Sequence, residues 1–430
     1  MRNNIYTRRS LLKGAALGAA AFAVQPLLGY RNAAFAAAGD PDKFVVIVNC
    51  LGGNDGLNTV VPAHLQPYID RRPQLNLVEN LPAGAVLHDL DGNFKLHHDL
   101  GGLKTLWDDS DLHIVDQVAY PDPNQSHFTS QDIYSFGIRD NIVNGDGRGW
   151  LGRFADVYCA NPVEPLGVIA VGSGRRKDFE SNLVAPLILD DVESFTVDLD
   201  AEFPDDFALR EKMVRDALAA APAPVGEPSQ SLFDTSGLAY ELVDRVQQET
   251  ATWIDPGTYP GSVTGRRMRT ISQLVHAHDS FRTKVFYTGL GGFDTHSGQA
   301  NRHDSLMGEL DGALSAFAED MKAKGKWDDC VVILISEFGR RVAENGSAGT
   351  DHGNGGAFMV MGGAVKGKDT AGGMTGALVE ADIADANTLP FRYDFRDVYS
   401  NVITNHLGVD PTPLFPDPDY TPAVGDLDLI

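Results

Sequence analysis

Carboxylates and imidazoles, the usual protein ligands of zinc, manganese or iron, recur in this sequence close to runs of apolar residues. One group lies in G-F-D-T-H-S-G-Q at 292–299, and a second lies in I-S-E-F-G-R-R at 335–341 and G-T-D-H-G-N-G-G at 349–356. Ligands of open α/β sheets bind beyond the carboxyl ends of the strands, so groups placed directly after strands can converge. The candidate metal ligands in these segments are Asp294, His296 or His303, Glu337, Asp351 and His352.

Two further segments follow predicted strands. G-G-N-D-G-L-N-T at 52–59 places Asp55 after the first strand, either as a ligand or simply in a turn, because glycine, asparagine and aspartate are turn formers. S-H-F-T-S-Q-D at 126–132 places Ser126 at the start of a helix, either as a nucleophile or as an ordinary N-cap. We expect Asp55, Asp294, His296 and His352 to share one pocket at the carboxyl edge of the sheet.

Other histidines lack this placement after a strand. We interpret them as surface or capping residues; examples are His97, His98, His276 and His278.

The elements that would position these residues follow from hydrophobic patterning. Continuous β-branched runs bounded by glycine predict buried parallel strands at 44–50, 111–118, 165–172, 283–292, 329–336 and 356–363. Between the fourth and fifth runs, apolar residues at helical spacing predict an amphipathic crossover helix over 299–324. This alternation predicts an α/β fold with a doubly wound, mostly parallel sheet and helices on both faces.

We expect a single α/β domain over residues 43–430. Residues 177–265 are acidic and contain a Pro/Ala-rich stretch at 220–228, so they are interpreted as a helical or irregular insertion or cap. The Pro/Asp-rich tail from Asp410 onward is expected to form an extended strap.

The first 36 residues have the layout of a cleaved export signal. Five basic residues and no acidic ones accompany an apolar run from Gly14 to Leu28 and an A-F-A triplet at 34–36. The adjacent Arg8 and Arg9 indicate the twin-arginine export machinery as a partner, and hence a periplasmic or secreted protein. The apolar run is too short for a membrane span, and none is expected in the mature protein.

Composition excludes several other classes. A formal charge of −24 argues against a nucleic-acid-binding surface. Three singly placed cysteines are too few for a disulfide scaffold, and no Cys-x-x-Cys pair suggests a redox or zinc-knuckle site. A serine esterase of the common hydrolase type is disfavoured because no G-x-S-x-G motif occurs.

The sequence resembles the bacterial, twin-arginine-exported family named domain of unknown function 1501, itself similar to a remote branch of the alkaline phosphatase and sulfatase superfamily. The matching segments are L-G-G-N-D-G-L-N-T-V-V-P, S-H-F-x-x-Q-D, F-D-T-H-x-x-Q, S-E-F-G-R and D-H-G. The resemblance implies an alkaline phosphatase-like fold with one or two divalent ions, zinc, manganese or calcium, at the carboxyl edge of the sheet.

Residue by residue, the resemblance implies that Asp55 is a metal ligand and Ser126 the nucleophile. Asp294 with His296 or His303 would correspond to the Asp-x-x-x-His pair of one metal. Glu337 would fall where the superfamily has an Asp-His pair, and His352 would match a late histidine ligand. Arg340 or Arg341 could hold a phosphate or sulfate oxygen through a bidentate fork.

The sequence departs from the superfamily pattern at three points. Glu337 is followed by Phe338 instead of histidine, and the spacing from Asp294 to His296 is shorter than the pattern unless His303 is the partner. No Cys-x-Pro-x-Arg segment for formylglycine chemistry occurs. We therefore expect an exported metal-dependent hydrolase of small-molecule or polymer phosphate or sulfate esters. The alternative is a non-catalytic exported binding or assembly protein on the same fold with a degenerate metal site.

Overall fold

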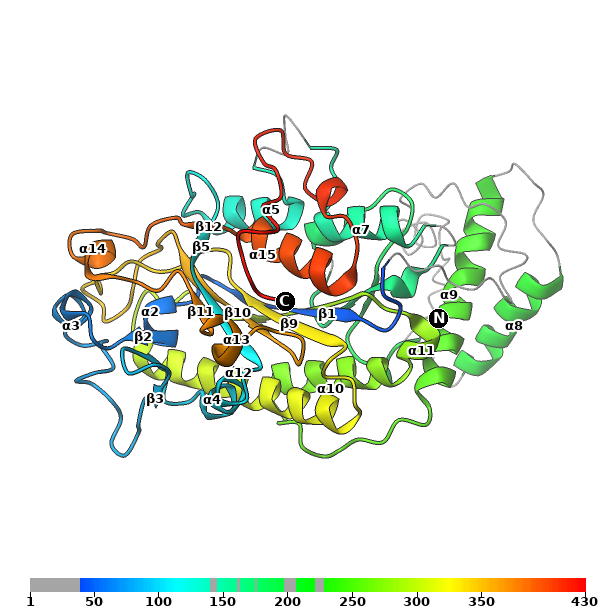
Figure 1. Ribbon diagram of the computed structural model, residues 1–430. Helices are drawn as coiled ribbons and strands as arrows, with labels where there is room; N and C mark the ends of the chain where they lie inside the picture. Colours follow the sequence, from blue (N-terminus) through cyan, green and yellow to red (C-terminus); the bar gives the residue numbers. More distant parts are fainter. Residues whose placement is uncertain (1–38, 140–144, 161–162, 175, 197–205, 221–227) are drawn as a thin grey trace, which may run out of the picture.

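The computed structural model describes residues 39–139, 145–160, 163–174, 176–196, 206–220 and 228–430 (Figure 1). The export signal expected at 1–36 lies outside the described residues. A nine-stranded sheet forms the centre of the molecule. Its strands, in spatial order, are β11 (Met374–Thr375), β5 (Leu112–Ala119), β10 (Gly356–Met361), β9 (Cys330–Ile335), β1 (Phe44–Leu51), β8 (Val285–Gly291), β6 (Val168–Val171) and β7 (Leu187–Leu189), with β12 (Tyr393–Asp394) paired to β5.

The sheet is mostly parallel, as predicted, and all six expected strands are present. Only β10 runs against its neighbours β5 and β9, and every other strand pair of this sheet is parallel. A separate three-stranded sheet contains β2 (Val60–Pro62), β4 (Phe94–Leu96) and β3 (His88–Asp89).

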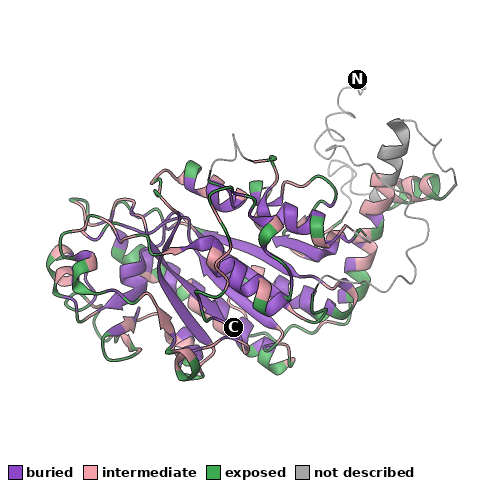
Figure 2. Ribbon diagram, turned by 45° about the horizontal axis from the view of Figure 1, so that its top comes forward, coloured by how far each residue is buried: buried purple, intermediate pink, exposed green. Residues whose placement is uncertain are grey.

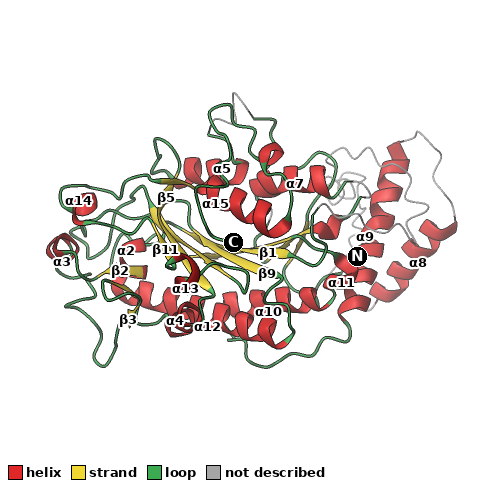
Figure 3. Ribbon diagram, in the orientation of Figure 1, coloured by secondary structure: helices red, strands yellow, loops and turns green. Residues whose placement is uncertain are grey.

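Helices cover both faces of the sheet, which confirms the predicted fold class (Figure 3). On one face lie α5 (His127–Phe136), α7 (Trp150–Tyr158) and α15 (Phe395–Val402); on the other lie α4 (Gly101–Asp108), α10 (Val263–His276) and α12 (Gln299–Ala323). The remaining helices are α2 (Gly56–Thr59), α3 (Gln66–Arg71), α8 (Phe207–Ala220), α9 (Pro228–Thr250), α11 (His278–Phe281), α13 (Lys368–Ala371) and α14 (Glu380–Ile383).

Each face of the sheet has its own hydrophobic core. In β1, Val46 and Val48 pack in the cluster with α4, α10 and α12, whereas Val45 and Ile47 pack in the cluster with α5, α7 and α15. Because successive side chains of a strand point to opposite faces, a strand covered on both sides is apolar throughout. The central strands β1, β5, β9 and β10 are accordingly buried along almost their whole length (Figure 2).

The antiparallel direction of β10 brings one further loop to the carboxyl edge of the sheet. Since β10 is antiparallel to β9, the loop that precedes β10 lies at the same edge as the loops that follow β1, β8 and β9. The helix predicted at 299–324 is α12, which connects β8 to β9 across β1. Four loops distant in the sequence therefore meet at one edge.

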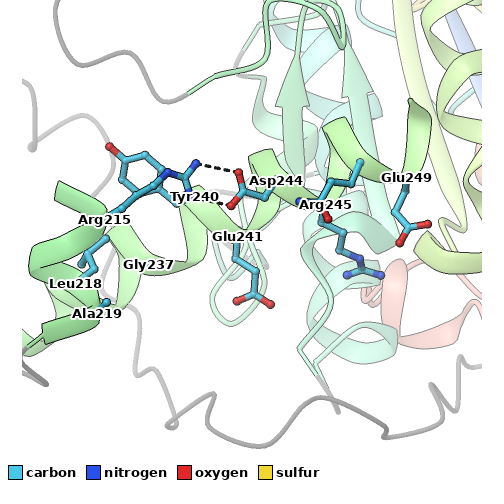
Figure 4. Close-up of a pocket in the computed structure, with 10 residues that line it drawn as sticks. Arg215, Leu218, Ala219, Gly237, Tyr240, Glu241, Asp244, Arg245 and Glu249 are labelled. Carbon is cyan, nitrogen blue, oxygen red and sulfur yellow. Dashed lines mark hydrogen bonds and ion pairs between the residues drawn. The ribbon is translucent and has the colours of Figure 1, made fainter. Parts of the chain in front are cut away.

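Residues 177–265 contribute the edge strand β7 and the helices α8 and α9, which lie at the end of the molecule opposite α2 (Figure 1). An open hollow of about 550 Å³ between α8 and α9 is lined by Arg215, Tyr240 and Asp244, among others (Figure 4). The tail after Asp410 contributes Leu414, Phe415, Leu427 and Leu429 to the core shared with α15. Within the described part of the chain, no helix is long and apolar enough to cross a membrane.

Candidate metal centre

One carboxylate oxygen, Oδ1 of Asp294, is the point at which the loops of the carboxyl edge meet. Asp294 follows β8, and its Oδ1 accepts a hydrogen bond of 2.8 Å from Nη2 of Arg340. The Nε2 atoms of three imidazoles approach the same oxygen: those of His352 at 3.1 Å, His296 at 3.1 Å and His127 at 3.4 Å. Nε2 of His296 lies 2.9 Å from Nε2 of His352. The loops after β8 and β5 and before β10 thus converge on one oxygen.

The other nitrogen of each ring faces an acceptor. Nδ1 of His352 lies 2.7 Å from the carbonyl oxygen of Gln125, and Nδ1 of His127 lies 2.9 Å from Oε1 of Glu337. Nδ1 of His296 lies 3.4 Å from Oδ1 of Asp351. When Nδ1 carries the proton toward such an acceptor, Nε2 keeps its lone pair, which is the arrangement of metal-ligating histidines.

The residues present fit a divalent cation. Nε2 of His127 is buried without a hydrogen-bond partner, and it faces Asp294. Ligand atoms of His127, Asp294 and His352 lie within 4.8 Å of one another. The spacings of 2.9–3.4 Å that centre on Asp294 and His352 are close to the separation of about 3.3 Å between ligands of tetrahedral zinc. Lone pairs packed this closely repel unless a proton or a metal ion lies between them.

Charges around the centre favour a cation at the same place. Burial alone would raise the pKa of Asp294, but the hydrogen bond from Arg340 and the neighbouring ring of His352 hold that pKa well below its ordinary value. The hydrogen bond to Glu337 raises the pKa of His127, whereas burial lowers the pKa of His352. Asp294 is therefore anionic, and Glu337 and Asp294 together stabilise a proton or a metal ion on Nε2 of His127.

Glu337 lies behind His127 instead of beside Asp294. It is buried, and its Oε1 accepts hydrogen bonds from Nδ1 of His127, from Nε2 of Gln131 at 3.0 Å and from the backbone N–H of Gly52 at 2.9 Å. Burial would raise the pKa of Glu337, but these hydrogen bonds keep it lowered. Glu337 was expected among the ligands; in the structure its Oε1 instead orients the imidazole of His127.

Phe338, the residue after Glu337, packs between two candidate ligands. Its ring centroid lies 4.8 Å from that of His127 and 4.7 Å from that of His352. Gly53 makes this packing possible, because at a φ of +80° a Cβ atom would lie 2.3 Å from the Phe338 ring. Gly52 has a φ of +122°, and a Cβ there would lie 2.4 Å from the backbone nitrogen of Asp294.

The two arginines expected to bind an anion differ in what they can reach. Arg340 is buried, and its guanidinium donates to the backbone oxygens of residues 52, 53, 293 and 350 as well as to Asp294. It holds the loops together and does not face solvent. The side chain of Arg341 is 45% exposed and lies 3.5 Å from Asp351, so it can still turn toward an anion.

Asp55 does not join this group, although it was expected in the same pocket. Its carboxylate is buried in a bidentate ion pair with Arg72, with N···O distances of 2.6 and 3.0 Å, and also accepts from Gln299. Burial would raise the pKa of Asp55, but Arg72 lowers it. Gln299 in turn accepts from Thr295 and Thr350, so Asp55 supports the two loops that carry the candidate ligands.

The structure separates the alternatives His296 and His303. His296 lies beside Asp294, whereas His303 is buried in α12 with Nε2 3.5 Å from Oγ1 of Thr59. Burial lowers the pKa of His303 to about 3.

Ser126 occupies the N-cap position of α5, directly before His127. Its hydroxyl makes no capping hydrogen bond, so the N-cap interpretation does not account for this side chain. The positive end of a helix dipole favours an anion at this position.

Sequence reasoning missed His127 and Gln131, which both contact Glu337. A signal existed, since the two are four residues apart in S-H-F-T-S-Q-D and therefore lie on one face of α5. Sequence reasoning also dismissed His97 and His98, which the structure places in a second group of histidines and aspartates.

A family model described as "Protein of unknown function (DUF1501)" matches residues 196–419, just over half of the chain. The chain belongs to this family. The matched residues of this DUF1501 protein include Asp294, His296 and His352, together with Glu337 and Asp351, whose carboxylates face the imidazoles. No curated protein is significantly similar to this chain.

Several solved structures are similar to this DUF1501 protein at low identity. The zinc complex of the C-terminal periplasmic domain of EcEptC from Escherichia coli is 10% identical, with a TM-score of 0.37, over 91% of this chain and 93% of that one. A protein in the alkaline phosphatase superfamily from Vibrio parahaemolyticus is 10% identical, with a TM-score of 0.33, over 88% and 70%. PsFucS1 sulfatase from Pseudoalteromonas sp. is 10% identical, with a TM-score of 0.38, over 89% and 69%.

Proposed function

We propose that this protein is an exported, metal-dependent hydrolase of phosphate or sulfate esters. The observation that supports the proposal most is the approach of three Nε2 atoms to Oδ1 of Asp294 while each opposite Nδ1 faces an acceptor. Such an arrangement is costly without a cation and is the usual support for a metal ion. The ester class is the one that the sequence resemblance leads us to expect.

The ligand set would comprise His127, Asp294 and His352, with His296 at its rim. Imidazole-rich sets of this kind suit zinc or manganese better than calcium, which prefers oxygen ligands. When bound, the ion would lower the pKa of a nearby hydroxyl or water and polarise an ester oxygen. Glu337 and Asp351 would hold the rings of His127 and His296 in orientation, and Arg340 would hold Asp294.

Ser126 is the proposed nucleophile. Attack by its Oγ would release the hydroxyl proton to solvent, form a bond to phosphorus or sulfur and break the ester bond, and the leaving alkoxide would take a proton from water and depart as the alcohol. A second attack by water would release phosphate or sulfate and restore the hydroxyl. Arg341, on the exposed side of Asp351, would bind the non-bridging oxygens of the anion.

Metal content and turnover, measured together on the purified mature protein, test this proposal. We expect bound zinc or manganese and hydrolysis of p-nitrophenyl phosphate or p-nitrophenyl sulfate. Asp294→Asn and His352→Ala should lose the turnover and the ion of this centre, because each removes a donor from the shared site. His276→Ala, which changes an exposed histidine of α10, is the matched control and should keep both.

Three results would contradict parts of the proposal. Unchanged metal content in Asp294→Asn and His352→Ala would exclude this ligand set. Wild-type turnover in Ser126→Ala would exclude the serine nucleophile and leave a bound water in that role. Metal bound at this centre with no turnover of either ester would favour the alternative of a non-catalytic binding or assembly protein.

A further inference from the structure

A second group of imidazoles and carboxylates lies between the segment that precedes α4 and the N-terminal half of α12. Ligand atoms of His97, His98, Asp99 and Asp304 lie within 4.8 Å of one another. We propose that His98, Asp99 and Asp304 bind a divalent transition-metal ion, Zn²⁺ or Mn²⁺, at a site separate from the centre around Asp294.

The two histidines of this group have different roles. Nδ1 of His97 accepts a hydrogen bond of 3.1 Å from the backbone N–H of Asp99, so its Nε2 carries the proton and donates to Oδ1 of Asp304 at 3.0 Å. Both nitrogens of His97 are therefore occupied. His97 is a positioning residue that fixes Asp304, whose Oδ2 remains on the side of His98.

His98 points between the two carboxylates. Its Nε2 lies 3.3 Å from Oδ2 of Asp99 and 3.8 Å from Oδ2 of Asp304. The side chain is only 6% exposed, its Nδ1 is buried without a hydrogen-bond partner, and its ring stacks on His97 at 4.0 Å. A buried imidazole that no strong hydrogen bond holds in place is explained by an ion between Nε2 and the carboxylates.

Charge favours the same conclusion. In the described part of the chain, only the imidazoles of His97 and His98 lie within ion-pair distance of Asp99 or Asp304. Among the described residues no lysine or arginine pairs with these two carboxylates, so they repel each other, and a bound cation would offset that repulsion.

The donor set and its exposure indicate the class of ion. One imidazole and two carboxylates suit zinc or manganese, whereas calcium requires six to eight oxygen ligands. The side chains of Asp99 and Asp304 are 38% and 23% exposed. An ion can therefore enter from solvent, and water can complete its coordination.

The two sites are structurally independent. His303 borders the second group, with its ring 5.4 Å from that of His97. The buried Asp55–Arg72 pair is connected through Gln299 to the loops of the first centre. Side chains of the second group make no contact with Asp294, His352 or His127 among the interactions of the described residues. Substitutions in one site should leave the other intact.

Metal-stripped full-length mature protein, dialysed against Zn²⁺ or Mn²⁺ and analysed for bound metal, tests the proposal. We expect about two ions per chain in the wild type, about one in Asp99→Asn/Asp304→Asn, about one in Asp294→Asn/His352→Ala and none in the quadruple variant. Asparagine at position 304 keeps an oxygen that accepts the hydrogen bond from His97. Circular dichroism spectra of the variants check that each is folded. His98→Gln, which removes only the imidazole donor, is the second variant.

The outcomes separate this site from the proposed catalytic centre. If wild type and Asp294→Asn/His352→Ala both bind about one ion, and Asp99→Asn/Asp304→Asn binds none, the second site stands although the first fails. Unchanged binding in folded Asp99→Asn/Asp304→Asn and in His98→Gln would overturn the second site. Loss of one ion in both of these variants, with turnover retained, would support it.

Discussion

In each imidazole of the candidate centre, the contact made by Nδ1 determines that Nε2 is the nitrogen available to an ion. Glu337 accepts from Nδ1 of His127 and thereby leaves Nε2 of that ring directed at Asp294. A carboxylate in this position also makes the ring a stronger electron donor. The buried Glu337 therefore acts on the centre through His127, and the packing of Phe338 against the same ring fixes its angle.

Gly53→Ala should disrupt the centre without touching any ligand. A Cβ at Gly53 would lie 2.3 Å from the Phe338 ring, so Phe338 must move and His127 and His352 lose their packing partner. Gly84→Ala is the matched control, because Gly84 has nearly the same φ, +84° against +80°, but no atom within 4 Å of the added Cβ.

Both substitutions should cost about 1–2 kcal/mol of unfolding free energy from left-handed backbone strain. Only Gly53→Ala should also lower metal content and turnover, which metal analysis and ester hydrolysis assays of both variants would measure. Equal metal content in the two variants would show that Phe338 does not support the ligands.

Residue types and spacing were enough to predict part of the cluster around Asp294. Asp294, His296 and His352 were recognisable because each lies beside a strand in a polar, glycine-rich segment. The role of Asp55 was not recognisable, because its partner Arg72 reaches it only through the folding of α3 and the following turn. Likewise, nothing in the sequence shows that Glu337 turns toward α5.

At the scale of elements, β5 carries a buried irregularity beside the centre. Its register with β10 shifts between the residues that pair with Gly356 and Phe358, and Gln117 has a φ of +60°. The adjacent Asp116 is buried and accepts a hydrogen bond of 2.7 Å from the N–H of Gln117. Burial raises the pKa of Asp116 to about 7, so it is protonated in the folded protein at acidic pH.

This raised pKa makes stability depend on pH in a defined direction. The unfolded chain releases the proton near its ordinary pKa of about 4, whereas the folded protein keeps it up to about 7. The contribution of Asp116 to stability is therefore complete below about pH 4 and is lost as the pH rises through 7.

Asp116→Asn, which resembles the protonated carboxyl group, should remove that dependence. The stability gained over wild type should be about 1–3 kcal/mol larger at pH 8 than at pH 5, since a tenfold change in proton affinity corresponds to about 1.4 kcal/mol. Urea unfolding at the two pH values measures the difference. Asp385→Asn, at an exposed position, is the control. A gain that is equal at both pH values would contradict the raised pKa.

Long elements were predictable, and short or reversed ones were not. The six strands are recognisable because burial on both faces makes each a continuous apolar run, and the helix over 299–324 is recognisable because burial of one face places apolar residues at helical spacing. The direction of β10 is set by its pairing with β9 and β5, which no local pattern encodes. β11 and β12 are two residues long, and each is a strand only through its pairing with β5, which no local sequence pattern shows.

For the whole molecule, the candidate centre forms only when the chain has folded. Its ligands range from His127 to His352; His127 begins α5, and Asp294 and His352 lie on loops next to β8 and β10. The unfolded chain does not hold these donors together, so loading with metal requires a folded protein. This requirement would suit the twin-arginine route proposed from Arg8 and Arg9, because that route carries folded proteins.

Export of the full-length chain should therefore depend on the arginine pair. Replacing Arg8 and Arg9 by lysine keeps the charge of the segment but removes the pair that marks the twin-arginine route, so precursor should accumulate in the cytoplasm. Cell fractionation followed by immunoblotting would measure the ratio of precursor to mature protein. Arg2→Lys makes the same conservative change outside the pair and should be exported normally. Mature protein outside the cytoplasm at wild-type levels in the double variant would exclude this route, and the metal would then have to be acquired after export.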